Sequence, residues 1–395
     1  MTAISNQSTK LSTFTSALST LYGPLSPSHI PNPSTWTPPQ SSGGHKGRYL
    51  WTDAFGVLCL ITLHAETNRL HQSKSKRQSQ GETESEGGSE HYLTLASRLI
   101  ENVHDTLGYT RDGSRRLSGA SDSNPLGGGL RIGKIDESGS DGDGQYHHYL
   151  TLWMFALNRM SLASREPRYN DLAIKLARAI HAPFFLNRSS ERPRMVWKMS
   201  TELETVLVGS EGNLDPIDGF VMMQLLQATA LKYGEREEVL KNEIEDYARV
   251  MKRKGEHFVS SDPLDLGMTM WTIQWVYEEN WAARLAERCF EQIYALFEEN
   301  RYLSRSKARR LPFREFGTAL GIRCMAEQDS EKERSVDLRV YADQIVDCWT
   351  PEMRSTIQGG AMDDLRPINR VMFAAALIPG AFQRGYLGNE PRMVK

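Results

Sequence analysis

Apolar positions recur along the chain with helical spacing, and no stretch alternates convincingly as a β-strand. Two kinds of helical segment alternate along the chain. Segments of the first kind are apolar on nearly every side, so they must be buried all round. They are 54–63, 146–157, 220–226, 268–276, 316–325 and 368–378. Segments of the second kind carry one apolar stripe and one polar face, at 92–103, 172–180, 239–250, 281–297 and 336–345.

The buried segments outnumber the amphipathic ones by one, and the missing partner is supplied near the N-terminus by Leu11, Phe14, Leu18 and Leu21. Six buried helices wrapped by six amphipathic ones predict an all-α fold, the (α/α)6 toroid of six helical hairpins with an inner and an outer ring. We expect one domain over residues 1–395, with inner helices starting near residues 54, 145, 217, 267, 315 and 367.

Three segments interrupt the helical pattern. Residues 72–90 are charged and rich in Ser and Gly, which predicts a flexible insertion within the first hairpin. Residues 110–144 form a long Gly-rich loop before the second inner helix, and long loops in compact domains are often functional. Residues 23–47, rich in Pro and Ser, predict an extended strap along the surface.

Composition narrows the choice of partners. The chain has 395 residues, with 47 Lys and Arg against 49 Asp and Glu, a net charge of −2. This balance gives no overall positive field, so we expect neither a nucleic-acid nor a membrane partner. The N-terminal segment lacks the pattern of a secretory signal, and four scattered cysteines indicate buried thiols, so we expect a cytoplasmic protein. We expect no cofactor and no metal.

The start of each inner helix is polar before it becomes apolar, and in a toroid all six starts meet at one rim. Asp and Ser are also preferred N-caps, which explains Asp262 and Asp265. Capping does not explain the aromatic and basic residues expected beside the same rim. A mouth with carboxylates, aromatic faces and cations suits a polyhydroxylated small molecule. The substrate-binding residues predicted on this ground are Trp51, Arg131, Tyr146, His147, Lys198, Asp218, Trp271 and Arg366.

Two runs carry a resemblance to a known group. The run GRYLWTDAFG at 47–56, followed by a Gly-rich loop and DGQYHHYLTLWMFAL at 143–157, resembles the first two inner helices of the six-hairpin glycosidase superfamily. That group includes glucoamylase-like and trehalase-like hydrolases and, more distantly, N-acylglucosamine 2-epimerase-like isomerases. The resemblance implies that Asp53, with Trp51 beside it, binds the sugar at the cleavage point. The paired-acid run of the hydrolases has no counterpart in this sequence.

The leading hypothesis is an enzyme that acts on a sugar or glycoside by carboxylate acid/base chemistry. Glycoside cleavage needs one acid for the leaving oxygen and one carboxylate for water or direct attack. Units two and five face each other across a six-fold ring, which would bring Asp143 and Glu315 to about 7 to 10 Å. We assign the acid role to Glu315 because its neighbours are apolar, with Asp215 as the reserve base.

Three alternatives remain open at this point. A sugar epimerase or isomerase would use His147 to move a proton next to a carbonyl. A biosynthetic enzyme would enclose a non-sugar small molecule among the Met and Trp residues of the inner helices. A non-catalytic toroid would bind a ligand or a protein, because a fold alone does not fix a function.

Overall fold

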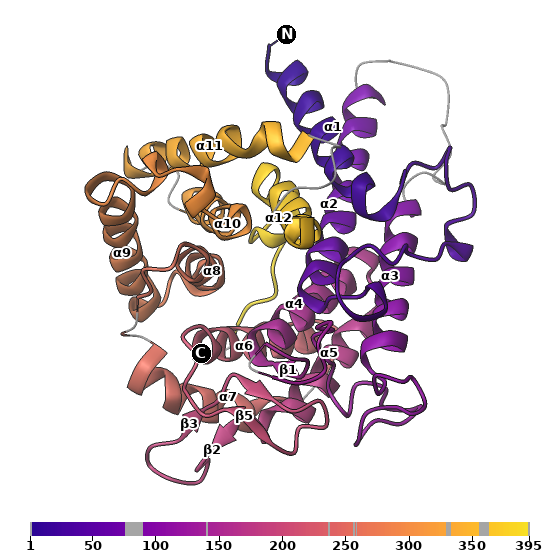
Figure 1. Cartoon of the computed structure of the whole chain (residues 1–395), viewed down its shortest axis with the longest axis vertical. Helices are drawn as coiled ribbons and strands as arrows, with labels where there is room; N and C mark the ends of the chain where they lie inside the picture. The colour runs from indigo at the N-terminus through magenta and orange to yellow at the C-terminus, as the bar shows by residue number, and fades with distance from the viewer. Residues whose placement is uncertain are drawn as a thin grey trace.

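The computed structural model describes residues 2–75, 90–139, 141–235, 238–255, 257, 259–328, 333–354 and 363–393. Six of its helices form an inner ring (Figure 1). Each packs on the next, α2 on α4, α4 on α6, α6 on α8, α8 on α10 and α10 on α12, and α12 returns to α2. The inner helices are α2 (Leu50–Ser75), α4 (His147–Ser164), α6 (Asp215–Lys232), α8 (Pro263–Ile273), α10 (Pro312–Gln328) and α12 (Arg366–Leu377).

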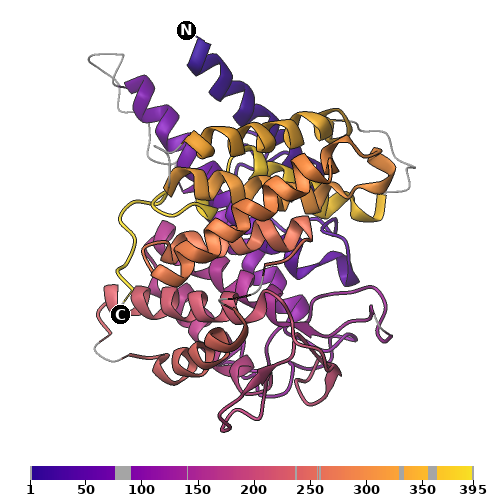
Figure 2. The same ribbon diagram turned by 90° about the vertical axis from the view of Figure 1, so that its left-hand side faces the viewer.

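The other six helices lie outside this ring, each against inner helices. The outer helix α1 packs on α12 and α2, and α11 covers α10 and α12. Figure 2 shows α1 projecting from the ring with the N-terminus at its tip. The (α/α)6 toroid predicted from the apolar pattern is therefore confirmed. The outer helices are α1 (Thr2–Tyr22), α3 (His91–Leu107), α5 (Pro167–His181), α7 (Lys241–Val250), α9 (Asn280–Tyr294) and α11 (Glu333–Arg354).

Inner helices α8 and α10 approach each other closely because glycines face one another between them. A Cβ on Gly267 would lie 2.2 Å from the backbone oxygen of Gly317, and one on Gly321 would lie 2.1 Å from that of Gly267. Real side chains do not tolerate such distances, so only glycine allows the two backbones to meet here.

The interior of the ring is packed rather than hollow. The short helix η10 (Gly380–Phe382) follows the C-terminal end of α12, and its Phe382 ring lies 4.7 Å from that of Phe55. The Phe382 carbonyl accepts hydrogen bonds from Trp271 Nε1 at 3.1 Å and Gln274 Nε2 at 3.0 Å. Phe382 and its partners therefore fill the space between α2, α4 and α8.

Five short strands among the described residues depart from the expected absence of β-structure. Strands β1, β4 and β5 form one antiparallel sheet, and β2 pairs with β3. Strands of two or three residues are too short to show an alternating pattern in a sequence. Their bounds are β1 (Gln145–Tyr146), β2 (Phe185–Leu186), β3 (Arg194–Met195), β4 (Lys198–Met199) and β5 (Val206–Val208).

The insertion predicted at 72–90 falls mostly outside the described residues; residues 72–75 continue α2, and Glu90 directly precedes α3. The four cysteines are free thiols, three of them buried as expected, whereas Cys348 is only half-buried. No helix in the described part of the chain is both long and apolar enough to span a lipid bilayer.

Candidate active site

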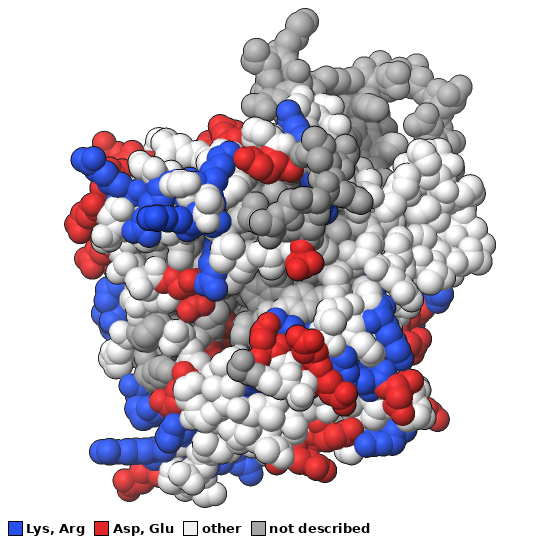
Figure 3. Space-filling model, in the orientation of Figure 1, with Lys and Arg blue, Asp and Glu red and all other residues white. Residues whose placement is uncertain are grey.

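A pocket of about 380 Å³ lies at the N-terminal ends of three consecutive inner helices, α4, α6 and α8. This is the rim at which the sequence predicts a ligand site. The face of the molecule seen in Figure 3 is hollowed near its middle, with carboxylate groups at several points of the edge. The pocket is lined by His148, Trp197, Ser210, Glu211, Gly212, Asn213, Leu214, Asp215 and Asp265.

Asp215 is the first residue of α6 and is only 2% exposed. Proline follows it, a residue suited to the first turn of a helix. Gly212 makes room for the carboxylate, since a Cβ there would lie 1.6 Å from Asp215 Oδ2. Asp215 Oδ1 lies 3.3 Å from His147 Nδ1 and 3.9 Å from His148 Nδ1. Burial favours the neutral acid, but the two histidines outweigh it and lower the pKa of Asp215.

Asp265 occupies the first turn of α8, on the other side of the same pocket. Its carboxylate accepts hydrogen bonds from Asn213 Nδ2 at 3.3 Å and Ser260 Oγ at 3.2 Å. The neighbouring Asp262 is the N-cap of the helix and accepts from the backbone N–H of Leu264 at 2.9 Å. Burial, together with the charge of Asp262, raises the pKa of Asp265. The predicted cap is thus confirmed for Asp262, whereas Asp265 is a pocket residue.

Asp218 lies one helical turn after Asp215, beneath the pocket, and accepts a hydrogen bond from Thr272 Oγ1 at 2.8 Å. Burial raises its pKa well above the ordinary value, and the nearby Asp215 and Asp265 act in the same direction. Of the three carboxyl groups gathered here, the pKa of Asp215 is lowered and the pKa values of the other two are raised.

The two adjacent histidines have different surroundings. His147 is fully buried, and its Nε2 lies 2.6 Å from the Tyr247 hydroxyl of the outer helix α7. His148 borders the pocket with a side chain that is 23% exposed. Burial lowers the pKa of His148. His148, rather than the predicted His147, is therefore the histidine that a ligand can meet.

Aromatic rings make one wall of the rim. The Tyr146 ring lies 5.2 Å from that of Trp197 and 6.1 Å from that of His148. Trp51 packs beside His148 at 5.8 Å and donates its indole N–H to the sulfur of Met372 at 3.4 Å. Lys198 places its ammonium 5.1 Å from the centre of the Tyr146 ring, and burial lowers the pKa of that lysine. Trp51, Tyr146 and Lys198 thus lie beside the pocket residues His148 and Trp197, but all three are buried and none of them lines the pocket.

Asp53 does not belong to this group. It is fully buried, its Oδ1 accepts from Tyr22 at 3.2 Å and from Ser42, and it pairs with Arg48 at 3.3 Å. Its other oxygen accepts the backbone N–H of Tyr49 at 3.3 Å. The carboxylate therefore fixes the N-terminal strap onto α2, and we leave it out of the candidate site.

The predicted catalytic pair, Asp143 and Glu315, has two unrelated sets of partners. Asp143 pairs with Arg131 at 2.6 Å and Arg111 at 2.7 Å and accepts three backbone N–H groups of its own loop. Glu315 accepts both a fork of Arg310 and the indole N–H of Trp349, on outer helix α11, at 2.8 Å. Neither carboxylate lines the rim pocket. Both oxygens of each are occupied, so we assign structural roles to Asp143 and Glu315, and with them to Arg131.

Two further predicted ligand residues lie outside the pocket lining. Trp271 is 2% exposed and engaged by η10 in the ring interior. Arg366 is half-buried at the start of α12. The structure also adds residues that the sequence reasoning did not select: Trp197, Asn213 and Asp265. Trp197 and Asn213 lie in irregular segments, where no periodic apolar pattern marks a residue as facing a pocket. Asp265 was interpreted only as a helix cap.

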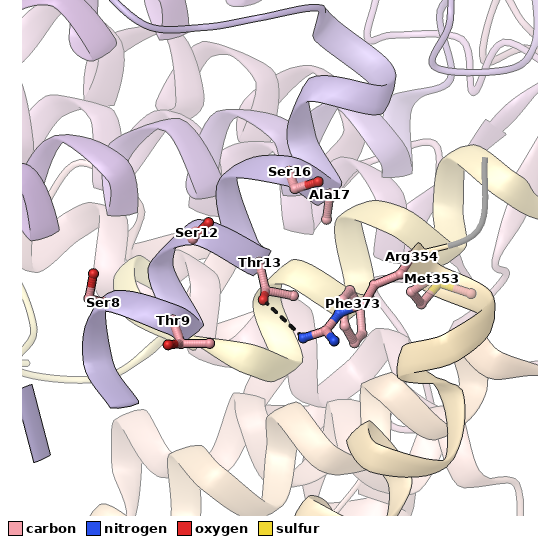
Figure 4. Close-up of a pocket in the computed structure, with 9 residues that line it drawn as sticks. All are labelled: Ser8, Thr9, Ser12, Thr13, Ser16, Ala17, Met353, Arg354 and Phe373. Carbon is pink, nitrogen blue, oxygen red and sulfur yellow. Dashed lines mark hydrogen bonds between the residues drawn. The ribbon is translucent and has the colours of Figure 1, made fainter. Parts of the chain in front are cut away.

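Another pocket, of about 490 Å³, lies between α1, α11 and α12 (Figure 4). Serine and threonine side chains of α1 face it, and Arg354 donates to Thr13 at 3.5 Å. None of the described residues that line it carries a carboxylate, so it offers no acid/base pair. Within the described ranges, no group of three or more His, Cys, Asp or Glu is arranged to hold a metal ion.

Comparison with solved structures finds the same arrangement of helices in three structures of glycoside hydrolase family 76. A GH76 alpha-mannanase of Bacteroides thetaiotaomicron matches with 10% identity over 83% of this chain and 86% of that chain, with a TM-score of 0.51. A family 76 glycoside hydrolase from a bovine strain of the same species matches with 10% identity over 93% and 76%, with a TM-score of 0.52. A family 76 mannosidase from strain VPI-5482 matches with 11% identity over 94% and 98%, with a TM-score of 0.50.

No protein-family model matches the sequence, and no curated protein does so either. At identities of 10 to 11%, the structural matches establish the arrangement of the helices and not the chemistry. The chain thus shares its (α/α)6 fold with structures of glycoside hydrolase family 76.

Proposed function

We propose that the chain is a glycoside hydrolase whose active site is the pocket at the N-terminal ends of α4, α6 and α8. One observation carries this proposal: two carboxyl groups line one pocket, and their surroundings shift their pKa values in opposite directions, Asp215 down and Asp265 up. Such a divergence separates the acid and base roles of a pair.

Glycoside cleavage uses the two groups as follows. Asp265, whose pKa is raised by burial and by the charge of Asp262, donates its proton to the leaving glycosidic oxygen. Asp215, kept ionised by its histidines, acts at the anomeric carbon, either through water or by direct attack. His148 and His147 position the Asp215 carboxylate from one side, and Gly212 leaves space on the other.

The substrate class we propose is an α-mannoside. The pocket combines the carboxylates of Asp215 and Asp265 with the ring of Trp197, which suits the apolar face of a pyranose; Tyr146 packs behind Trp197. The names of two structural neighbours, an alpha-mannanase and a mannosidase, support mannose in particular.

The test is the hydrolysis of aryl α-mannosides and α-mannan oligosaccharides by purified protein. Asp215→Asn and Asp265→Asn should each lower kcat about 10²-fold or more, because each removes one proton-transfer group or nucleophile. Asp141→Asn is the matched control: Asp141 belongs to the loop before α4, and its side chain is 80% exposed. Full activity of both pocket variants would reject this site, provided that wild type cleaves the substrate.

A further inference from the structure

The segment between α9 and α10 carries a cluster of positive charge. Arg301, Arg305, Lys307 and Arg309 are all exposed. Lys307 is paired, since it donates to Glu352 at 2.6 Å and to the Cys348 carbonyl at 2.7 Å. Arg301, Arg305 and Arg309 pair with no carboxylate among the described residues. Figure 3 shows blue side chains gathered at the upper left, where Figure 1 shows the connection from α9 to α10.

The backbone of the segment that carries this cluster is held in place by its neighbours. The segment forms two short helical turns, η7 (Tyr302–Ser304) and η8 (Lys307–Arg309). Tyr302 is buried beneath them and lies 4.9 Å from the Arg305 guanidinium. Arg310 anchors the end of the segment through its fork onto Glu315. The backbone that carries the three exposed arginines is therefore fixed on the surface.

This surface adjoins the mouth of the ring. The segment runs directly into α10, whose Arg314 pairs with Asp262, the N-cap of α8. Asp265 of the pocket lies on that same first turn of α8. Arg314 is also close enough to Tyr149 of α4 for its charge to act on the phenol. The rim thus has an acidic side at α6 and α8 and a basic side at the start of α10.

The geometry points to a subsite for an anionic group on the substrate: the arginines Arg301, Arg305 and Arg309 bind a phosphate or comparable anion attached to a glycan whose neutral sugar occupies the acidic pocket. This inference rests on the proposed glycosidase function. The net charge of the whole chain is −2, so the attraction is local to this side of the rim. Guanidinium forks suit phosphate oxygens, and the three together should raise affinity about tenfold at low salt.

The experiment compares a synthetic α-mannotetraose carrying one terminal phosphate monoester with the same tetrasaccharide without phosphate. Calorimetry should show about tenfold tighter binding of the phosphorylated sugar at low ionic strength, and this preference should fall as salt screens it. The triple variant Arg301→Gln, Arg305→Gln, Arg309→Gln should lose the preference but keep the affinity for the neutral tetrasaccharide. A charge-matched triple variant at other exposed arginines, Arg168→Gln, Arg192→Gln, Arg284→Gln, should keep it.

The outcomes separate the two proposals. Equal affinity for the two sugars, with cleavage of both retained, overturns the anionic subsite and leaves the glycosidase proposal intact. Absence of binding and cleavage for either sugar overturns both. Vesicles containing phosphatidylserine and a single-stranded oligonucleotide serve as competing anions. Arginine-dependent binding of either of these without any sugar preference would assign the cluster to a membrane or a nucleic acid and overturn the subsite.

Discussion

Arg131 and Asp143 form an ion pair with 2.6 Å between Nη1 and Oδ2, and both side chains are fully buried. Arg131 also donates to the carbonyls of Tyr109 and Thr106, which ties the Gly-rich loop to the end of α3. The carboxylate expected to do chemistry thus holds the loop that leads into α4.

Asp143→Asn should destabilise the protein by about 3 to 5 kcal/mol, because it leaves the buried Arg131 without its counter-charge. Urea or thermal denaturation measures the loss, and Asp141→Asn, in the same loop but exposed, should stay within about 0.5 kcal/mol of wild type. Unchanged stability together with a large loss of activity would instead return Asp143 to the catalytic role.

The pH dependence of kcat/KM on an α-mannoside should be bell-shaped. In the proposed mechanism, activity needs Asp215 ionised and Asp265 protonated. The pKa of Asp215 is lowered from 3.8, so the acid limb lies below the ordinary carboxyl range; the pKa of Asp265 is raised from 3.8, so the alkaline limb lies above it. The active window is the interval between these two limbs.

The variant Asp262→Asn tests whether the alkaline limb belongs to Asp265. Asparagine is as good an N-cap as aspartate, so α8 should remain intact. The substitution removes a negative charge that raises the pKa of Asp265, so the alkaline limb should move to lower pH while the acid limb stays in place. An alkaline limb that does not move in Asp262→Asn, or that moves equally in Asp141→Asn, would show that Asp265 is not the acid.

The helices were predictable because each one needs only its own periodicity. Inner segments such as 316–325 are apolar on all sides, and outer segments such as 281–297 carry a single apolar stripe. The local sequence therefore indicates which face of each helix is buried. The rim followed from topology, since inner helices of a toroid start at one end. The pocket at the starts of α4, α6 and α8 agrees with that reasoning.

The site residues were harder because their partners are distant in sequence. Asp53 meets Tyr22, 31 residues earlier, and Glu315 meets Trp349, 34 residues later. A single sequence shows an acid at a helix start, but not the distant phenol or indole that donates a hydrogen bond to it. The pocket role of Asp265 was not predicted, because the helix dipole alone is enough to explain an acidic residue in the first turn of a helix.

Gly267→Ala tests the close contact of α8 and α10. The added methyl group would lie 2.2 Å from the Gly317 oxygen, a backbone atom that cannot rotate away. Overpacking of this kind should cost about 1 to 3 kcal/mol of unfolding free energy. Gly209→Ala, where a Cβ meets nothing within 4 Å, is the control and should be nearly neutral. Equal stability of the two variants would contradict the tight glycine packing.

Asp218→Asn should stabilise the protein, by an amount that grows with pH. Burial raises the pKa of Asp218 in the folded state, so the folded chain keeps the proton after the unfolded chain has released it. Below the pKa of Asp218 in the unfolded chain, both states are protonated and Asp218 costs no stability. As the pH rises from that value toward the pKa in the folded chain, the free energy of unfolding falls. The total loss is about 1.4 kcal/mol for each pKa unit between the two states.

Asparagine does not titrate and can still accept from Thr272, so the Asp218→Asn variant avoids this loss. Calorimetric Tm values should therefore match those of wild type near pH 3 and exceed them by a margin that widens as the pH rises above the unfolded pKa. Asp122→Asn, whose side chain is fully exposed, should show no such widening. A margin that is constant across pH would mean that Asp218 does not hold its proton in the folded state.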